Sequence, residues 1–212
     1  EKTMKKIFAL MLCLCLMCCA AASAEGIVDT IKEKGVLVMG TEATYGPYEF
    51  LDDNANPIGC DVWLAEQIAA ELGVELQVTD MAFDGIIDAV KTGMVDIGIA
   101  AFTVNEERAK VIDFSHEYEK SQQLLIVQKG DADKYTTVES LAGLKVGAQM
   151  GTIQSQLIEA ALPDSELFEL DTYPSLAMEV VNGNIVGFVC DYAVGMGMVA
   201  SNDKLEAANF TF

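Results

Sequence analysis

The sequence predicts an α/β fold made of two lobes with similar topology. After residue 24, short apolar strands alternate with amphipathic helices, which is typical of parallel sheets covered by helices. A helix-turn-strand pattern that starts at Phe83 recurs at Tyr173, with each matched residue 90 positions later. Chance similarity between α/β units is the alternative. We expect two related lobes with a ligand cleft at the carboxyl ends of their strands.

The first 24 residues predict a signal peptide that precedes the fold. Lysines beside Met4 lead into an apolar run from Ile7 to Ala22, and a small-x-small cleavage motif ends at Ala24. A membrane anchor is the alternative, although the run is shorter than the roughly 20 residues that a spanning helix needs. We therefore expect an exported protein, located in the periplasm or at the cell surface.

Charge and cysteine placement restrict the partners further. The formal net charge of −20 becomes more negative without the signal, which argues against nucleic acid or an anionic membrane surface as partner.

Cys18 or Cys19 could carry a lipid anchor, although the preceding residues match a lipobox poorly. Cys60 and Cys190 lie in the mature chain. The sequence alone cannot show whether they form a disulfide, and isolated buried thiols are the favoured interpretation.

Glycines mark the ends of the expected helices in the first half. Gly35, Gly73 and Gly93 each follow an apolar helical pattern, and Asp61 is positioned to cap the second helix. The expected elements are helices at 27–34, 62–72 and 83–92 and strands at 36–40, 75–79 and 95–100.

Candidate binding residues in the first half follow the expected strands. Glu42 and Tyr45 lie in an aromatic loop after the first strand, and Phe83 follows the second, either as a cleft wall or as a hydrophobic staple for its helix. Thr103 and Arg108 follow the third strand. These loops meet at the carboxyl edge of a parallel sheet, where α/β proteins usually bind ligands.

Arg108 is the only arginine among 33 acidic residues. Its planar guanidinium can bind a carboxylate through two parallel hydrogen bonds and does not lose its charge. The alternative is an ordinary surface ion pair with Glu106 or Glu107.

The second half offers complementary groups. The segment from Gly147 to Thr152 leads from an expected strand into a helix that begins near Ile153, whose first backbone N–H groups could bind an anion. Asp191 ends a later strand, where it could bind a cation or cap the next helix. A cation, a helix N-terminus and a carboxylate together suit a zwitterionic α-amino acid.

Several segments carry a resemblance to a known family, and together they span nearly the whole mature chain. The chain resembles family 3 of the bacterial extracytoplasmic solute-binding proteins, which deliver polar amino acids to ABC importers. The matching segments are Gly40–Phe50, Ile58–Ala65, Phe83–Ile87 and Thr103–Ser115, with weaker matches at Lys145–Thr152 and Gly183–Asp191.

The resemblance implies a type II periplasmic-binding-protein fold and a hinged closure of two lobes without chemistry. It implies that Arg108, with Thr103 and Thr152, binds the ligand carboxylate, and that Asp191 and the Ala101 carbonyl bind the ammonium. Aromatic rings at Tyr45 and Phe83 would close on the ligand, and Glu42 would help to set specificity. No catalytic residue, metal or cofactor is expected, and the partners are a small amino acid and an ABC permease.

The resemblance also predicts the domain organisation. Residues 1–24 are the signal, 25–118 form the first lobe and 119–212 the second, and the family's return segment to the first lobe is absent from the sequence. We expect a monomer. The alternatives are a sensor module of a longer membrane receptor and an exported dehydratase on the same fold, and the identity of the amino acid stays open.

Overall fold

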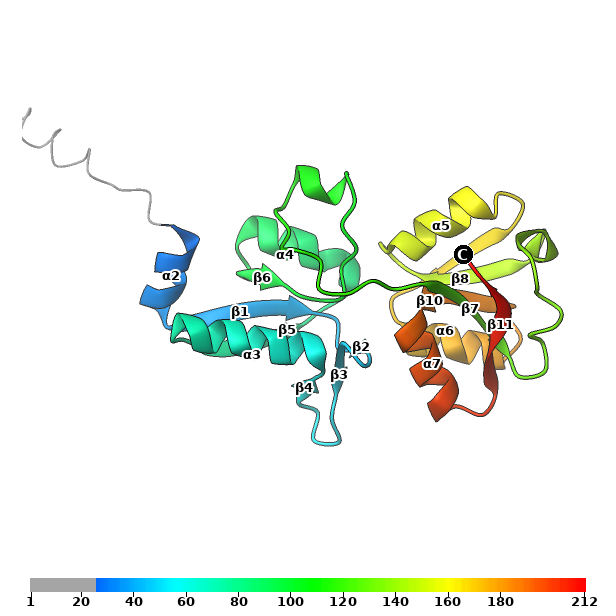
Figure 1. The fold of residues 1–212 in the computed structure, drawn as a ribbon, viewed down its shortest axis with the longest axis horizontal. Coiled ribbons are helices and arrows are strands. Elements are labelled where there is room, and N and C mark those ends of the chain that lie inside the picture. The colour runs from blue at the N-terminus through cyan, green and yellow to red at the C-terminus, as the bar shows by residue number, and fades with distance from the viewer. Residues whose placement is uncertain (1–25) are drawn as a thin grey trace, which may run out of the picture.

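The computed structural model describes residues 26–212, and the predicted signal and lipidation sites lie outside these residues. The chain forms two α/β bodies joined by an extended connector (Figure 1). No helix within residues 26–212 is long and apolar enough to cross a membrane. Two α/β lobes joined in this way agree with the fold that the family resemblance implies.

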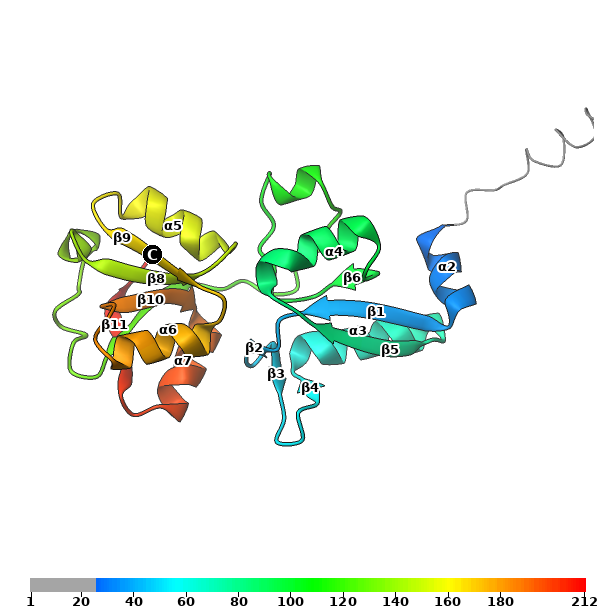
Figure 2. The same ribbon diagram turned by 180° about the vertical axis from the view of Figure 1, so that it is seen from behind.

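The first lobe is a parallel sheet with strand order β5-β1-β6. β1 (Val36–Thr41) pairs with β5 (Glu75–Asp80) on one side and with β6 (Ile97–Gly98) on the other. Apolar residues of α3 (Cys60–Leu72) pack on one face, and α4 (Ile86–Thr92) lies on the other (Figure 2). A further helix, α2 (Ile27–Lys34), packs Ile31 at the edge of this core.

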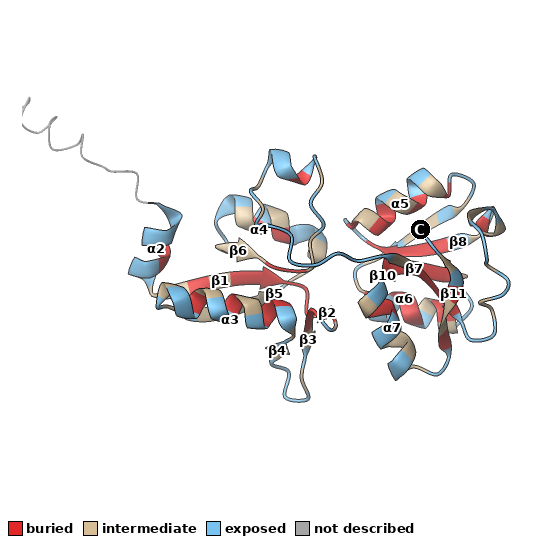
Figure 3. Ribbon diagram, viewed as in Figure 1, coloured by how far each residue is buried: buried red, intermediate tan, exposed pale blue. Residues whose placement is uncertain are grey.

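The second lobe is a five-stranded mixed sheet with order β11-β7-β10-β8-β9. Its strands are β7 (Gln123–Gln128), β8 (Lys145–Gln149), β9 (Glu166–Leu170), β10 (Gly187–Asp191) and β11 (Leu205–Thr211). Side chains alternate along β10: Phe188 and Cys190 pack against α6 (Tyr173–Val181) and α7 (Tyr192–Ser201), whereas Val189 packs on the face that α5 (Ile153–Ala161) covers. The central strands are correspondingly buried (Figure 3).

The two lobes repeat one topology. The order β9-β8-β10 in the second lobe matches β5-β1-β6 in the first, and all of these pairs are parallel. In each lobe a glycine in the left-handed region follows the equivalent helix: Gly93, with φ 72°, directly follows α4, and Gly183, with φ 74°, lies two residues after the end of α6. The 90-residue sequence repeat therefore corresponds to a structural repeat.

A small antiparallel sheet extends the first lobe toward the second. Its strands are β2 (Thr44–Tyr45), β3 (Glu49–Leu51) and β4 (Pro57–Ile58). A cis peptide bond joins Gly46 to Pro47 between β2 and β3. The rings of Tyr45 and Tyr48 belong to the same apolar cluster as Tyr173 and Phe188 of the second lobe, so this sheet carries aromatic contacts between the lobes.

The connector spans residues 112–122 and contains neither helix nor strand. It leads from a short 3₁₀ helix at Arg108–Lys110 to β7. The predicted boundary between residues 118 and 119 falls inside the connector and stays a prediction.

Three local predictions were wrong in part. Asp61 does not cap α3, because Gly59 is the N-cap and Asp61 makes long-range hydrogen bonds instead. The third strand is confined to Ile97–Gly98, because the Asp96 carboxylate, in place of a backbone carbonyl, accepts the Val38 amide. Both mature cysteines are free thiols, but only Cys190 is buried and Cys60 is exposed.

The close packing of β10 yields a stability prediction. A Cβ atom on Gly187 would lie 2.6 Å from the Ile126 carbonyl oxygen of β7, and backbone atoms cannot easily move aside. We predict that Gly187→Ala lowers the free energy of unfolding by about 1–3 kcal/mol, as overpacking does elsewhere. Urea denaturation would measure this change.

Gly85→Ala is the matched control, because a Cβ there would meet no atom within 4 Å. It should change the free energy of unfolding by less than about 0.5 kcal/mol. Equal effects of the two substitutions would contradict the packing argument.

Candidate functional site

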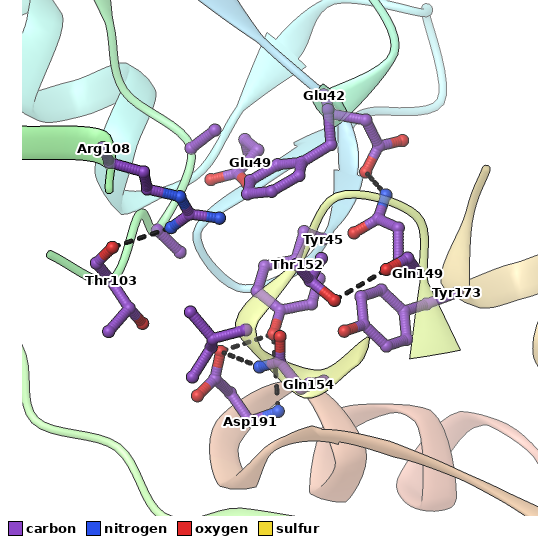
Figure 4. Close-up of a pocket in the computed structure, with 14 residues that line it drawn as sticks. Glu42, Tyr45, Glu49, Thr103, Arg108, Gln149, Thr152, Gln154, Tyr173 and Asp191 are labelled. Atoms are coloured by element: carbon purple, nitrogen blue, oxygen red, sulfur yellow. Dashed lines mark hydrogen bonds between the residues drawn. The ribbon is translucent and has the colours of Figure 1, made fainter. Parts of the chain in front are cut away.

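A pocket lies between the lobes where the carboxyl ends of their strands face each other (Figure 4). The structure brings all eight predicted site residues to its walls, and their roles stay predictions. The first lobe contributes Glu42, Tyr45, Phe83, Ala101, Thr103 and Arg108, and the second contributes Thr152 and Asp191.

Arg108 is buried at this pocket, with 7 % of its surface exposed. The Asn105 side chain accepts the Arg108 amide hydrogen at 2.8 Å, which fixes the turn that presents the side chain. The guanidinium carbon lies 5.6 Å from the centre of the Phe83 ring and 5.1 Å from that of Phe102. These two rings stack on each other at 4.6 Å and form an apolar wall beside the cation.

The guanidinium is bonded only to backbone carbonyls within residues 26–212. Nη1 donates to the Thr103 oxygen at 2.7 Å, and Nη2 donates across the cleft to the Gly151 oxygen at 3.0 Å. No ion pair forms with Glu106, Glu107 or any other described carboxylate, so the surface-pair alternative is wrong. Burial lowers the pKa of Arg108, as expected for a cation removed from water without a counter-ion.

Asp191 is the buried carboxylate on the opposite wall. Its oxygens accept hydrogen bonds from the Tyr45 hydroxyl at 2.5 Å, the Gln123 amide at 2.7 Å and the Gln154 amide at 3.4 Å. It is the N-cap residue of α7 by position, but its side chain makes no capping hydrogen bond. No described cation pairs with it, so the carboxylate is directed to the pocket and not to its own helix.

The N-terminus of α5 forms another part of the wall. Thr152 caps the helix by accepting the Ser155 amide hydrogen, and its hydroxyl donates to the Gln149 carbonyl at 2.6 Å. The first amides of an α-helix have no acceptor inside the helix and carry a partial positive charge. Ile153 and Gln154, which line the pocket, therefore present donors suited to an anion.

Two glutamates form an acidic end of the pocket. Glu42 accepts hydrogen bonds from Thr44 at 2.6 Å and from Gln149 of the second lobe at 3.1 Å, and burial raises its pKa. Glu49 is 1 % exposed, and its Oε2 has no hydrogen-bond partner among the described residues. Burial, followed by the negative charge of Asp61, raises the pKa of Glu49 to about 11, so Glu49 is neutral at pH 7.

The sequence analysis missed several residues of the pocket. Tyr173 lies 4.9 Å from the Tyr45 ring and is the repeat partner of Phe83, so the 90-residue repeat could have identified it. Glu49, Gln149 and Gln154 lie near predicted residues, but only the tertiary arrangement turns their side chains into the cleft.

The lobes are closed against each other around the site. Hydrogen bonds cross from Tyr45 to Asp191, from Arg108 to Gly151 and from Gln149 to Glu42. Because Arg108 and Asp191 are each only 7 % exposed, a ligand can reach them only when the lobes separate.

The arrangement is suited to holding a small zwitterion. It places a cation with helix-terminal donors on one side and a carboxylate on the other, between aromatic walls. In the part of the chain that the structure describes, no cluster of three or more His, Cys, Asp or Glu side chains is arranged to hold a metal ion.

Comparison with known proteins agrees with this geometry. The family model of bacterial extracellular solute-binding proteins, family 3, matches residues 37–162. The L-cystine-binding protein TcyJ of Escherichia coli is 30 % identical over 189 residues, covering 89 % of this chain and 71 % of that protein. The arginine-binding extracellular protein ArtP of Bacillus subtilis is 29 % identical over 205 residues, covering 96 % and 79 %.

A solved structure is similar over most of the chain as well. It is the amino acid ABC transporter substrate-binding protein AbpA from Streptococcus pneumoniae bound to L-arginine. The TM-score is 0.84 at 35 % identity, with 87 % of this chain and 79 % of that chain covered.

The raised pKa of Glu49 predicts how stability depends on pH. Its ordinary pKa is 4.5 and its folded value is about 11, so between these values the unfolded chain releases a proton that the folded chain keeps. Raising the pH therefore favours unfolding, by up to about 1.4 kcal/mol per pH unit from this group. Glu49→Gln should remove that dependence, so the variant should gain stability over the wild type between pH 5 and pH 8.

Urea denaturation at pH 5, 6.5 and 8 measures this difference. Glu66→Gln, at an exposed glutamate of α3, should follow the wild type at every pH. Parallel curves for Glu49→Gln and the wild type would show that Glu49 does not hold its proton in the fold.

Proposed function

The chain belongs to family 3 of the bacterial extracellular solute-binding proteins, and from this premise we propose that it captures a polar amino acid outside the cytoplasm for an ABC importer. The observation that carries the proposal is a pair of buried opposite charges on the two walls of one cleft. Neither Arg108 nor Asp191 has an ionic partner among the described residues.

The two charges match the two ends of an α-amino acid. We assign the ligand carboxylate to Arg108, helped by Thr103 and by the N-terminus of α5 at Thr152. We assign the ligand ammonium to Asp191 and the Ala101 carbonyl. Each buried charge would then gain the counter-ion that residues 26–212 do not supply, and this favours the zwitterion over a simple acid or amine.

Capture requires hinged movement of the lobes. An open form exposes Arg108 and Asp191 on separate lobes, and closure brings both onto one ligand and excludes water. Exclusion of water strengthens the charge pairs, because opposite charges attract more strongly in a medium of low dielectric constant. The hydrogen bonds that join the lobes around the pocket support closure as the ligand-holding state.

The acidic end of the pocket favours a ligand with a cationic, donor-rich side chain. Glu42 offers a carboxylate there, the neutral Glu49 offers an acceptor oxygen for a side-chain donor, and the Tyr45 and Tyr173 rings provide flat walls for a side chain to lie against. ArtP, which resembles this chain, is an arginine-binding protein, and the similar AbpA structure holds L-arginine. We therefore propose L-arginine as the first ligand to test.

The proposed activity is binding without chemistry, and the comparisons support it because the similar proteins described above are binding proteins. The predicted signal peptide supports export, and the proposal includes that the exported protein is a monomer that docks on an ABC permease. A lipid anchor at Cys18 or Cys19 belongs to the same proposal. The similar proteins do not favour the sensor and dehydratase alternatives.

The guanidinium fork can be tested by a change that keeps its charge. Arg108→Lys should weaken L-arginine binding by at least about 100-fold, because an ammonium cannot form two parallel bonds to a carboxylate and each charge-assisted bond contributes about 1.5–3 kcal/mol. Calorimetry measures the affinity, and circular dichroism checks the fold. The matched control is Lys110→Ala on the same 3₁₀ helix. Affinity within threefold of the wild type would exclude Arg108 as the anchor.

The side-chain preference can be tested at Glu42. Glu42→Gln should weaken L-arginine binding by about tenfold through loss of one charge contact, while binding of the neutral L-glutamine changes by less than about threefold. Thermal shift over a panel of all twenty amino acids, followed by calorimetry for these two, provides the comparison. Equal losses for both ligands would show that Glu42 does not distinguish a charged side chain.

A further inference from the structure

Asp61 is a fully buried carboxylate that lies outside the lining of the ligand pocket, at the second residue of α3. Within residues 26–212 it forms no ion pair. A buried charge persists only where hydrogen bonds satisfy it. Asp61 does not cap α3. Its role is therefore indicated by the groups that donate hydrogen bonds to it.

Its two close hydrogen-bond donors lie in the pocket wall and in the connector, and its negative charge also acts on the neighbouring Glu49 of the pocket. Oδ2 accepts the Ala101 backbone N–H at 2.8 Å and the Tyr118 hydroxyl at 2.9 Å. Oδ1 faces the Cys60 sulfur at 3.6 Å, which is a weaker contact. One carboxylate oxygen thus joins the pocket wall to the connector.

Ala101 is the pocket end of this link. Its φ of 47° lies in the left-handed region, which alanine rarely adopts unless its surroundings impose it. The bond from its N–H to Asp61 fixes the peptide plane before a residue that lines the pocket. The orientation of the carbonyl that we assign to the ligand ammonium depends on this backbone conformation.

Tyr118 is the connector end of the link. It lies in the segment 112–122 that carries the second lobe, and its side chain reaches back to the first lobe to donate to Asp61. Tyr118 as a whole is 47 % exposed, but desolvation at its hydroxyl and the negative charge of Asp61 raise its pKa well above the usual value, so the hydroxyl keeps the hydrogen that it donates. The course of the connector is thereby tied to α3.

We propose that Asp61 is a positioning residue that couples the connector between the lobes to the ammonium-binding wall of the pocket. It touches neither the pocket space nor the assigned ligand atoms, and it acts through Ala101 and Tyr118. The strength of ligand binding then depends on the conformation of the connector, because one oxygen of Asp61 holds both the Ala101 amide in the pocket wall and the Tyr118 hydroxyl in the connector. The inference rests on the proposed amino-acid binding and adds to it a structural link, through Asp61, between closure of the lobes and binding of the ligand.

Two substitutions separate the ends of the link. Tyr118→Phe removes only the hydroxyl, and Asp61→Asn keeps the side-chain shape but replaces the anionic acceptor. With L-arginine as the probe, we expect Tyr118→Phe to speed ligand dissociation about tenfold while the association rate changes less than twofold. Asp61→Asn should speed dissociation at least as much, and the double variant should be no faster than Asp61→Asn alone, because Tyr118 acts through Asp61. Tyr135→Phe in the second lobe is the matched control.

Stopped-flow rates, small-angle scattering at saturating L-arginine and unfolding curves form the experiment. A role confined to stability would lower the unfolding midpoint without changing the dissociation rate of the folded fraction. The inference is overturned if Tyr118→Phe dissociates within twofold of the wild type, or if the effects of the two substitutions simply add. Because Tyr118→Phe removes a single oxygen, it tests the link even if Asp61→Asn does not fold.

Failure of the binding proposal is distinguished by the wild type alone. If the wild type binds none of the twenty amino acids, the proposed function fails, and amide hydrogen exchange then tests the link without a ligand. Exchange at the Ala101 amide should be at least tenfold faster in Asp61→Asn than in the wild type, with the amides of β8 unchanged. Equal exchange at Ala101 would overturn the inference.

Discussion

The structure depends on one unusual constraint: the only guanidinium of the chain is buried between the lobes without a carboxylate partner in the described residues. Its hydrogen bonds go to the carbonyls of Thr103 and Gly151, and Phe83 and Phe102 cover it on one side. Neutral carbonyls satisfy the geometry of a guanidinium but do not neutralise its charge. The opposite wall carries the complementary problem at Asp191. A zwitterion with its charges suitably separated would neutralise both, and this electrostatic match supports the proposed binding of an amino acid between the lobes.

The repeated topology places these charges opposite each other. In each lobe a central strand has equivalent parallel neighbours, with order β5-β1-β6 in the first lobe and β9-β8-β10 in the second. In each lobe the loops that follow these strands therefore lie at one edge of the sheet. Joined by a connector without regular structure, the two sets of loops face each other across a cleft. The lobes are not equivalent there: the first supplies the cation and two carboxyl groups, whereas the second supplies a helix N-terminus, two amides and one carboxylate. Asp61 adds a connection between the connector and the wall at Ala101.

Much of the fold could be predicted because its signals are local. Gly35, Gly73 and Gly93 end their helices with positive φ, a conformation that the residue type itself permits. Predictions failed where distant contacts decide. Asp61 was predicted to cap α3 but lies in its first turn, and Ala101 and Tyr118, far along the chain, determine what it binds. The eight candidate residues meet because strand ends converge, a rule of topology. Glu49 could not be predicted because its burial, and the nearness of the Asp61 charge that helps to raise its pKa, arise only in the folded arrangement.

The central claim is that the cleft recognises both charged ends of a free amino acid at once. Calorimetric titration with L-arginine, agmatine and 5-guanidinopentanoic acid tests it most directly, because agmatine lacks the carboxylate and 5-guanidinopentanoic acid lacks the ammonium. The account predicts that L-arginine binds at least about 100-fold more tightly than either analogue, since each loses one set of charge-assisted bonds. If either analogue binds as tightly as L-arginine, the buried charges do not grip the two ends of the ligand, and the account is wrong.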